Sequence, residues 1–289
     1  MKLPLELTVS TLTAATMLAV GLELDIRKIP NVVRQKLPLP GMLLGQMLLL
    51  PAIALLIVRL VPMPESTKFV VLMLAACPTG NIANFFTLLA RGDLALTVSA
   101  SAISCLLTPI LMPATFAVYG GLLGAGFPFM VPAGPLLTRI FALTWAPIFV
   151  GLALRSIRSQ TIARFSTGLR HVCALGTVVL CVYICVSRAR QLTLDWQTNM
   201  MVSLMLIVAA LAGAAGITTV LRLPTDDAIS YMTSFPARHI GVLAAVTVTT
   251  LHRLDDLVFI LVYFVLETLV ILALVGSYRW RGSSQAIST

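Results

Sequence analysis

A proline and small polar residues interrupt an apolar run early in the sequence, in the stretch Cys77-Pro78-Thr79-Gly80-Asn81-Ile82-Ala83. A second apolar run is interrupted in the same way, in the stretch Phe235-Pro236-Ala237-Arg238-His239-Ile240-Gly241. The two stretches align position by position, and each is followed by a short charged turn and another apolar run. A proline in mid-run frees backbone groups that must then be satisfied inside the bilayer. The pattern predicts two discontinuous membrane helices related by an internal repeat.

The composition of the chain is that of a membrane protein. Its 289 residues are 58% apolar and only 11% charged, with a mean hydropathy of +0.99, whereas soluble domains carry about 25% charged residues. Apolar runs of the length needed to cross the hydrocarbon core fill most of the sequence: residues 5–24, 39–61, 69–90, 94–119, 135–154, 168–186, 200–221, 228–250 and 257–276. Because these runs lack the period-two alternation of a β-barrel, each is expected to be helical. The sequence predicts an all-α integral membrane protein of about nine transmembrane helices.

Positive charges are unequally divided between the gaps that separate the runs. Twelve Lys and Arg residues fall in one set of alternate gaps and six in the other, and cytoplasmic loops carry the excess. This predicts a multi-pass protein of the cell inner membrane with its N-terminus outside and its C-terminus in the cytoplasm. The loops account for most of the net charge of +9, and no basic stripe indicates a nucleic-acid partner. Arg139 and Arg238 fall within predicted runs.

The two interrupted runs are the third and the eighth, so an odd number of crossings relates them and they enter the membrane from opposite sides. We expect an inverted repeat within one transporter unit of residues 1–289, with residues 1–120 as a shortened first copy and residues 129–280 as the second. Each break frees carbonyls at one helix end and N–H groups at the next, which attract cations and anions respectively. The candidate substrate site is this crossover: Pro78, Thr79, Gly80, Asn81, Pro236, Arg238 and His239.

The residues around both breaks resemble a known family, the bile acid:sodium symporter family of organic-anion carriers. The similar stretches are Cys77 to Leu96, Gly21-Leu22-Glu23-Leu24, Gln46 followed by Pro51, and Ser234 to Gly241. The resemblance implies a symporter of a small organic anion in the lipid bilayer, with no cofactor apart from sodium and no obligate protein partner. It also implies a core and a panel domain with two crossing discontinuous helices. The third, fourth, seventh, eighth and ninth runs would form the core, and Gln46, on the second run, would face it from the panel.

The resemblance further implies two sodium ions behind the crossing. The ion-site positions that keep an oxygen donor, as a hard cation requires, are Gln46, Asn84, Thr97 and Ser101. Three positions depart from the family: Ala83 stands where a serine is usual, Ser234 where a glutamate serves both ions, and Arg238 where a glutamine is expected.

The arginine at position 238 changes what the second sodium position can hold. A guanidinium about 4 Å from a sodium ion is repelled by roughly 4 kcal/mol at an effective dielectric near 20, or on the order of a thousandfold in affinity. We therefore expect reduced or absent sodium dependence, with Arg238 as a built-in cation bonded to Gln46 or to freed carbonyls. The alternative role for Arg238 is a closed ion pair with Glu267, the carboxylate in the middle of the last run.

The sequence also allows functions other than an organic-anion transporter with Arg238 as a built-in cation. An ordinary sodium-coupled symporter and a membrane-embedded ligand sensor remain alternatives, whereas a cation/proton antiporter would require a carboxylate at the crossing. His239 could couple protons, but a lone histidine is more often a packing residue. An enzyme is not expected, because His171 and His239 have no Cys or acidic partner at helical spacing and the five cysteines lie in apolar runs without a CxxC pair. The substrate, the coupling ion, the direction of transport and the oligomeric state stay open.

Overall fold

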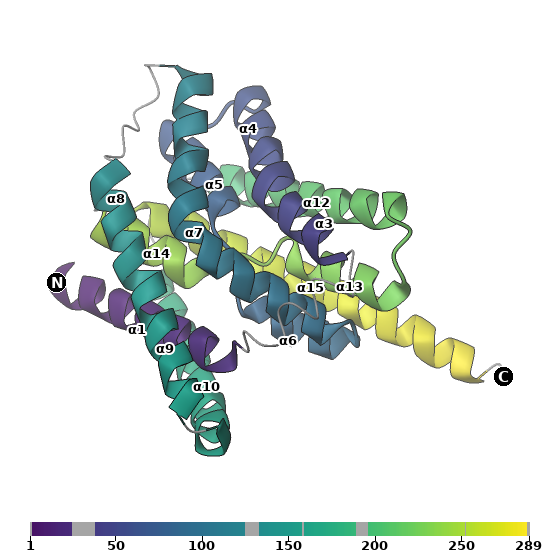
Figure 1. Cartoon of the computed structure of the whole chain (residues 1–289). Helices are drawn as coiled ribbons and strands as arrows, with labels where there is room; N and C mark the ends of the chain where they lie inside the picture. Colours follow the sequence, from purple (N-terminus) through teal and green to yellow (C-terminus); the bar gives the residue numbers. More distant parts are fainter. Residues whose placement is uncertain are drawn as a thin grey trace.

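The computed structural model describes residues 2–24, 38–124, 133–157, 159–188, 196–251 and 253–287, and within these ranges every regular element is a helix. The first half contains α1 (Lys2–Glu23), α3 (Pro38–Leu44), the π-helix η1 (Gly45–Leu49), α4 (Leu50–Leu60), α5 (Glu65–Ala76), α6 (Ile82–Ala90) and α7 (Leu94–Leu123). The second half contains α8 (Ala133–Ile140), the π-helix η2 (Phe141–Trp145), α9 (Ala146–Ile157), α10 (Ser159–Ser187), α12 (Trp196–Val220), α13 (Thr225–Ser234), α14 (Ile240–Thr249) and α15 (Asp256–Ile287). Figure 1 shows their arrangement.

Six helical stretches among the described residues are long and apolar enough to cross a membrane: residues 5–22, 38–60, 94–123, 138–156, 196–220 and 256–278. They correspond to six of the predicted runs. Two of the other runs are the interrupted ones, each of which forms two short helices, and the remaining run lies within α10. The prediction of an all-helical membrane protein is therefore confirmed.

Both interrupted runs break at the predicted proline. The helix α5 ends at Ala76, and Cys77 is extended, with φ −68° and ψ 151°, because the ring of a following proline disfavours the helical conformation of the residue before it. The helix α13 ends at Ser234, although Phe235 keeps helical angles before Pro236. After each break the chain becomes helical again within a few residues, at α6 and at α14.

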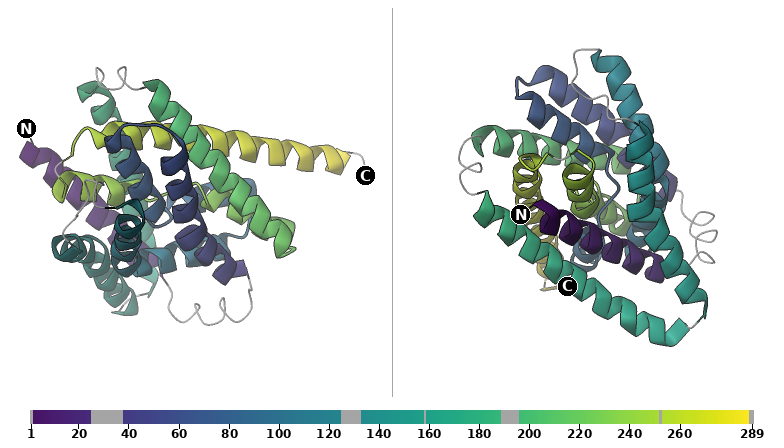
Figure 2. Two further views of the ribbon diagram at one scale, coloured as in Figure 1. Left: turned by 90° about the horizontal axis from the view of Figure 1, so that it is seen from above. Right: turned by 90° about the vertical axis from the view of Figure 1, so that its left-hand side faces the viewer.

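The helices form two groups in space. The helix α1 packs against α9 and α10, and Figure 2 shows it beside α10. Its backbone comes so close to α9 that a Cβ added to Gly21 would lie 2.2 Å from the carbonyl oxygen of Ile148, an approach that small residues permit in membrane helices. We call α1 and α8 to α10 the panel and the other described helices the core.

The helix that carries Gln46 belongs to the core, so the prediction that placed the second run in the panel is wrong. The helix α4 packs against α5 and α12, and α3 packs against α7. Tyr231 of α13 donates a hydrogen bond to the Pro38 carbonyl. A Cβ added to Gly45 would lie 2.4 Å from the Phe235 ring. The glycine thus leaves room for an aromatic ring of the core, a contact that an apolar pattern does not reveal.

Candidate functional site

The two breaks cross each other and satisfy part of each other's backbone. Thr79 and Arg238 form an antiparallel bridge. Two hydrogen bonds join the segments: from the Gly80 N–H to the Ala237 carbonyl at 3.0 Å, and from the His239 N–H to the Pro78 carbonyl at 2.9 Å. Unpaired backbone groups are costly away from water. The crossing is therefore a short two-stranded link between two broken helices.

Both second half-helices begin at the crossing. The helix α6 begins at Ile82 and α14 at Ile240, and the first-turn N–H groups of a helix have no partner within it. His239 caps α14, since its Nδ1 accepts a hydrogen bond from the Val242 N–H at 3.3 Å, while Asn81 makes no side-chain cap on α6. Two partly positive helix ends therefore lie at the crossing.

The Arg238 side chain is buried at 2% exposure and lies against the first half-helices. Its Nη1 donates to the Cys77 carbonyl and its Nη2 to the Phe235 carbonyl, both at 3.0 Å. These carbonyls follow the C-terminal ends of α5 and α13, where the helix dipole favours a cation. The Nε atom has no hydrogen-bond partner among the described residues. One guanidinium thus serves the negative ends of both broken helices.

Glu267 is fully buried in α15, at 0% exposure. Its carboxyl group lies within electrostatic range of Arg238 and of Tyr263. No side chain that the structure describes, however, donates a hydrogen bond to either carboxyl oxygen, and the group that lies against the carboxyl is the Arg238 backbone N–H. The predicted closed ion pair between Arg238 and Glu267 is not formed, because both terminal nitrogens of the guanidinium donate to backbone carbonyls instead.

Gln46 meets the first broken helix from η1, a π-helical turn of the kind often found at functional sites. Its Oε1 accepts a hydrogen bond from the Thr79 hydroxyl at 2.6 Å, and the Thr79 N–H donates to the Ser104 hydroxyl at 3.2 Å. The Gln46 Nε2 has no partner among the described residues. Gln46 and Arg238 line the same small hollow, in which Arg238 is the one charged lining residue.

The four other predicted ion-site positions are only partly brought together. Ser101 donates from its hydroxyl to Asn84 Oδ1 at 3.5 Å. The Thr97 hydroxyl instead contacts the Thr87 hydroxyl at 3.1 Å. Ser234 is fully buried, and its hydroxyl has no partner within the described ranges. The oxygens at these positions are amide or hydroxyl groups, without the carboxylate that the resemblance places at position 234.

Sequence reasoning missed several residues of the crossing. The Thr87 hydroxyl also contacts the Thr233 hydroxyl at 2.6 Å, and Tyr263 donates to the Pro236 carbonyl at 2.7 Å. The sequence could have indicated Ser104 as a site residue, because it continues the helical spacing of Thr97 and Ser101 along α7. No sequence signal marked Thr233 or Tyr263, because their partners lie on distant segments.

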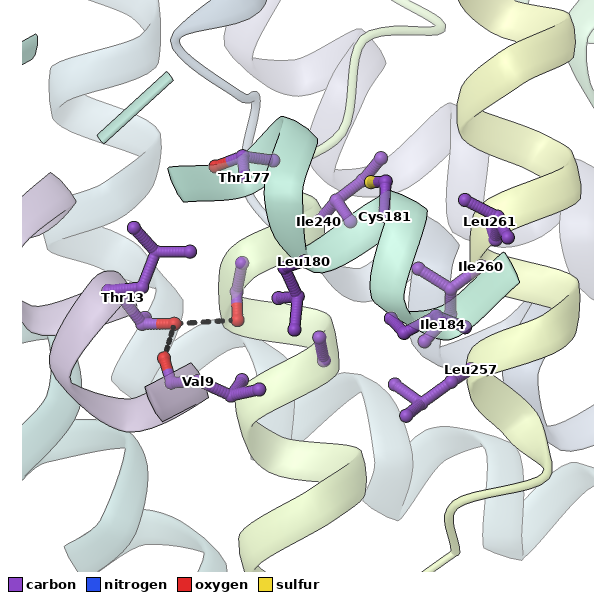
Figure 3. Close-up of a pocket in the computed structure, with 13 residues that line it drawn as sticks. Val9, Thr13, Thr177, Leu180, Cys181, Ile184, Ile240, Leu257, Ile260 and Leu261 are labelled. Carbon is purple, nitrogen blue, oxygen red and sulfur yellow. Dashed lines mark hydrogen bonds between the residues drawn. The ribbon is translucent and has the colours of Figure 1, made fainter. Parts of the chain in front are cut away.

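A second small hollow lies between the panel and the core. Figure 3 shows it lined by apolar side chains of α1, α10, α14 and α15, such as Val9, Leu180 and Leu257. Thr13 donates to the Val9 carbonyl at 2.8 Å and to the Gly241 carbonyl at 2.9 Å. The hollow therefore offers apolar surface, in contrast to the one beside Arg238.

The donors at the crossing suit an anion or a hard cation more than a transition metal. Within the residues that the structure describes, no group of three His, Cys, Asp or Glu side chains is placed to hold a metal ion. Buried N–H groups and hydroxyls predominate instead. Such an arrangement can bind and orient a charged solute, and it contains no paired nucleophile and base.

The family comparison agrees with this geometry. The chain matches the Sodium Bile acid symporter family over residues 12–194. The chain belongs to this family. Its members are transporters and not enzymes, so the predicted resemblance and the prediction of a non-enzymatic protein are confirmed. The matched region of this family member includes the first broken helix and ends before the second. The assignment of the second broken helix therefore depends on the structure.

The curated relatives are longer than this member of the family. The chain is 26% identical over 164 residues to the uncharacterized sodium-dependent transporter YocS of Bacillus subtilis. The aligned region covers 57% of this chain and 50% of the relative. The chain is 29% identical over 152 residues to sodium/bile acid cotransporter 4 of Homo sapiens. This aligned region covers 52% of this chain and 35% of the relative. The match thus spans half or less of these relatives' own length.

Proposed function

We propose that the chain is a secondary transporter of a small organic anion in which Arg238 replaces the second sodium ion of its family. The observation that carries this proposal is the position of the guanidinium, whose two hydrogen bonds end on the carbonyls of Cys77 and Phe235. These are carbonyls of the kind that would otherwise face a cation. A buried arginine inside a membrane protein is costly and is functional by default.

Sodium coupling is weakened at both implied positions. A sodium ion about 4 Å from the guanidinium is disfavoured by roughly 4 kcal/mol at an effective dielectric near 20. The other position retains Asn84 and Ser101, but Ala83 supplies no oxygen, and Ser234 supplies a hydroxyl in place of a carboxylate. Neutral oxygens alone must then offset the dehydration of the ion. The protein is therefore expected to work without sodium or with a reduced requirement for it.

The charge distribution favours an anionic substrate. Two helix N-termini face the crossing, and such ends bind anions through their free N–H groups. Gln46 Nε2 and Arg238 Nε are buried donors without a partner among the described residues, and their side chains line one hollow. The implied substrate carries a negative group that accepts hydrogen bonds from the crossing.

The test compares thermal stability of the purified protein in sodium and in potassium at equal ionic strength. The wild type is expected to unfold at the same temperature in both, and Arg238→Gln is expected to gain a sodium-dependent increase. A ligand at 100 times its dissociation constant stabilises the folded state by about 2.7 kcal/mol. Arg139→Gln is the matched control, because Arg139 also lies in a predicted run but donates to the Thr249 carbonyl, away from the crossing. It is expected to gain no sodium response.

An ordinary sodium-coupled symporter is the second candidate, because relatives are named as sodium-dependent or as sodium/bile acid cotransporters. A wild type that is already strongly stabilised by sodium would establish this candidate and refute the replacement by Arg238. For either candidate we propose the cell inner membrane as the location, with the N-terminus outside and the C-terminus in the cytoplasm.

A further inference from the structure

Glu267 is a buried carboxyl group that the proposed function does not use. It lies in the middle of the stretch 256–278 of α15 and is 0% exposed. No described side chain donates a hydrogen bond to its oxygens, and the Arg238 backbone N–H is the donor that lies against the carboxyl group. An ionised carboxylate in such a place is very unfavourable unless it is paired and hydrogen-bonded. An ionised Glu267 would therefore require a positive charge close to its carboxyl group.

The helix α15 presents Glu267 to the crossing. Tyr263, one turn earlier, donates to the Pro236 carbonyl at 2.7 Å. Ile271, one turn later, packs in a cluster with Ala83 and Ala237. Residues four apart lie on the same face of a helix. Glu267 thus lies behind the second broken helix, beside the segment that carries Arg238.

The charged groups near Glu267 are few. Among the described residues, Arg238 is the charged group that acts on it, and the neutral phenol of Tyr263 lies within range as well. The helices α6, α12 and α14, which pack against α15, carry no acidic, basic or tyrosine side chain. On α5, Glu65 and Lys68 pair with each other at 2.6 Å, and on α10 the titratable side chains nearest the α10 residues that line a pocket with α15 are Cys181, Tyr183 and Cys185, of which Tyr183 is 42% exposed.

Arg238 is near Glu267 but is committed elsewhere. Its two terminal nitrogens donate to the carbonyls of Cys77 and Phe235, and its Nε makes no hydrogen bond to a described residue. The guanidinium therefore supplies no hydrogen bond to the carboxyl group. In this arrangement the carboxyl group is stable when it carries a proton, because the neutral acid avoids the cost of a buried charge that no side chain bonds.

We propose that Glu267 is the proton-binding residue of this transporter and that its ionisation decides where Arg238 bonds. With the O–H bond intact, the guanidinium stays on the two carbonyls of the broken helices. When the proton leaves to water, the carboxylate becomes an acceptor that competes with those carbonyls for the N–H groups of Arg238. A proton then takes the coupling role that sodium has in relatives, and this step rests on the proposed function.

The consequence reaches both broken helices at once. Movement of the guanidinium toward Glu267 would leave the Cys77 and Phe235 carbonyls without their donor. Because unsatisfied buried carbonyls are costly, the crossing would have to rearrange in the deprotonated state. The proton on Glu267 and the shape of the crossing are thereby linked, which is what coupling of an ion to transport requires.

Infrared spectroscopy of the purified wild type tests the proposal without a substrate. At mildly alkaline pH, a C=O band of a protonated carboxylic acid is expected, shifted in D₂O and absent in Glu267→Gln. Asp256→Asn is the matched control, because Asp256 is also buried on α15 but is paired with Arg253 at 2.9 Å. This control is expected to keep the band of the wild type.

Isotope labelling keeps the test decisive if Glu267→Gln does not fold. Carboxyl-¹³C glutamate, incorporated into the wild type, is expected to shift the band, and Glu267 is the one glutamate of four that lies in mid-span. Absence of the band, its persistence in Glu267→Gln, or its indifference to labelled glutamate would each overturn the proposal. The sodium comparison on Arg238→Gln is independent, so failure of the proton site and failure of the proposed function give different results.

Discussion

Gly80 sits where the two broken segments come closest. A Cβ added at this position would lie 2.6 Å from the carbonyl oxygen of Arg238 and 3.0 Å from its carbonyl carbon. Both atoms belong to the backbone of the opposite segment and cannot turn away as a side chain can. The same residue donates its N–H to the Ala237 carbonyl at 3.0 Å. The hydrogen bond from the Gly80 N–H therefore requires a residue without a side chain at position 80.

We predict that Gly80→Ala destabilises the crossing. Forcing extra atoms into a packed site costs about 1–3 kcal/mol, and the cost lies at the upper end here because backbone must move. The thermal unfolding temperature of the purified protein should fall. Gly216→Ala, at a glycine of α12 with no atom within 4 Å of the added Cβ, should leave it unchanged or raise it slightly. Equal stability of the two variants would refute the close approach.

Three core helices are joined by hydroxyl groups. Thr87 of α6 contacts Thr97 of α7 at 3.1 Å and Thr233 of α13 at 2.6 Å. All three side chains are buried. Interhelical hydrogen bonds of this kind contribute to helix association in membranes. The second half of one broken helix is thus linked to the first half of the other, beside the crossing.

Replacement of Thr87 by valine should loosen this link. Valine keeps the shape of threonine but removes the hydroxyl, so Thr97 and Thr233 keep only their hydrogen bonds to backbone carbonyls. Each lost hydroxyl contact is expected to cost about 0.5–1.5 kcal/mol. We expect a lower unfolding temperature than for Thr144→Val, because the buried Thr144 hydroxyl bonds only to Ile140 of its own helical stretch at 2.6 Å. If the two variants lose equal stability, the bridge by Thr87 contributes nothing beyond a local bond.

The whole molecule divides into a core that holds the crossing and a panel that touches it at few polar points. Thr13 of α1 donates to the Gly241 carbonyl at the start of α14, and Arg139 of α8 donates to the Thr249 carbonyl at its end. The apolar hollow of Figure 3 lies along the same boundary. The second broken helix is therefore the part of the crossing that the panel holds directly.

We predict the orientation of the molecule in the membrane from its positive charges, and this orientation can be measured. Twelve Lys and Arg residues on one side against six on the other predict a cytoplasmic C-terminus. A green fluorescent protein fused after Thr289 should fluoresce, and alkaline phosphatase fused at the same place should be inactive. The same reporters fused before Met1 should give the opposite pattern. A fluorescent N-terminal fusion together with an active C-terminal phosphatase would reverse the proposed orientation.

Local features of the sequence were sufficient to predict that the chain is a helical membrane protein and that two of its helices are broken. A run of apolar residues has to be helical in lipid because its backbone groups have no other partners, and Pro78 and Pro236 interrupt such helices by their chemistry. The same reasoning singled out Arg238 and Glu267, because ionisable groups are rare in mid-membrane. These conclusions needed no knowledge of which helices are neighbours.

Neighbour relations were decided only by the tertiary structure. The place of Gln46 in the core depends on Phe235 filling the space beside Gly45, and the bonds of Arg238 to two carbonyls left Glu267 without its predicted partner. Apolar periodicity describes how much of a helix is buried but not against what. A hydrogen bond depends on distances of tenths of an ångström between segments far apart in the chain, and these are set only when the helices pack.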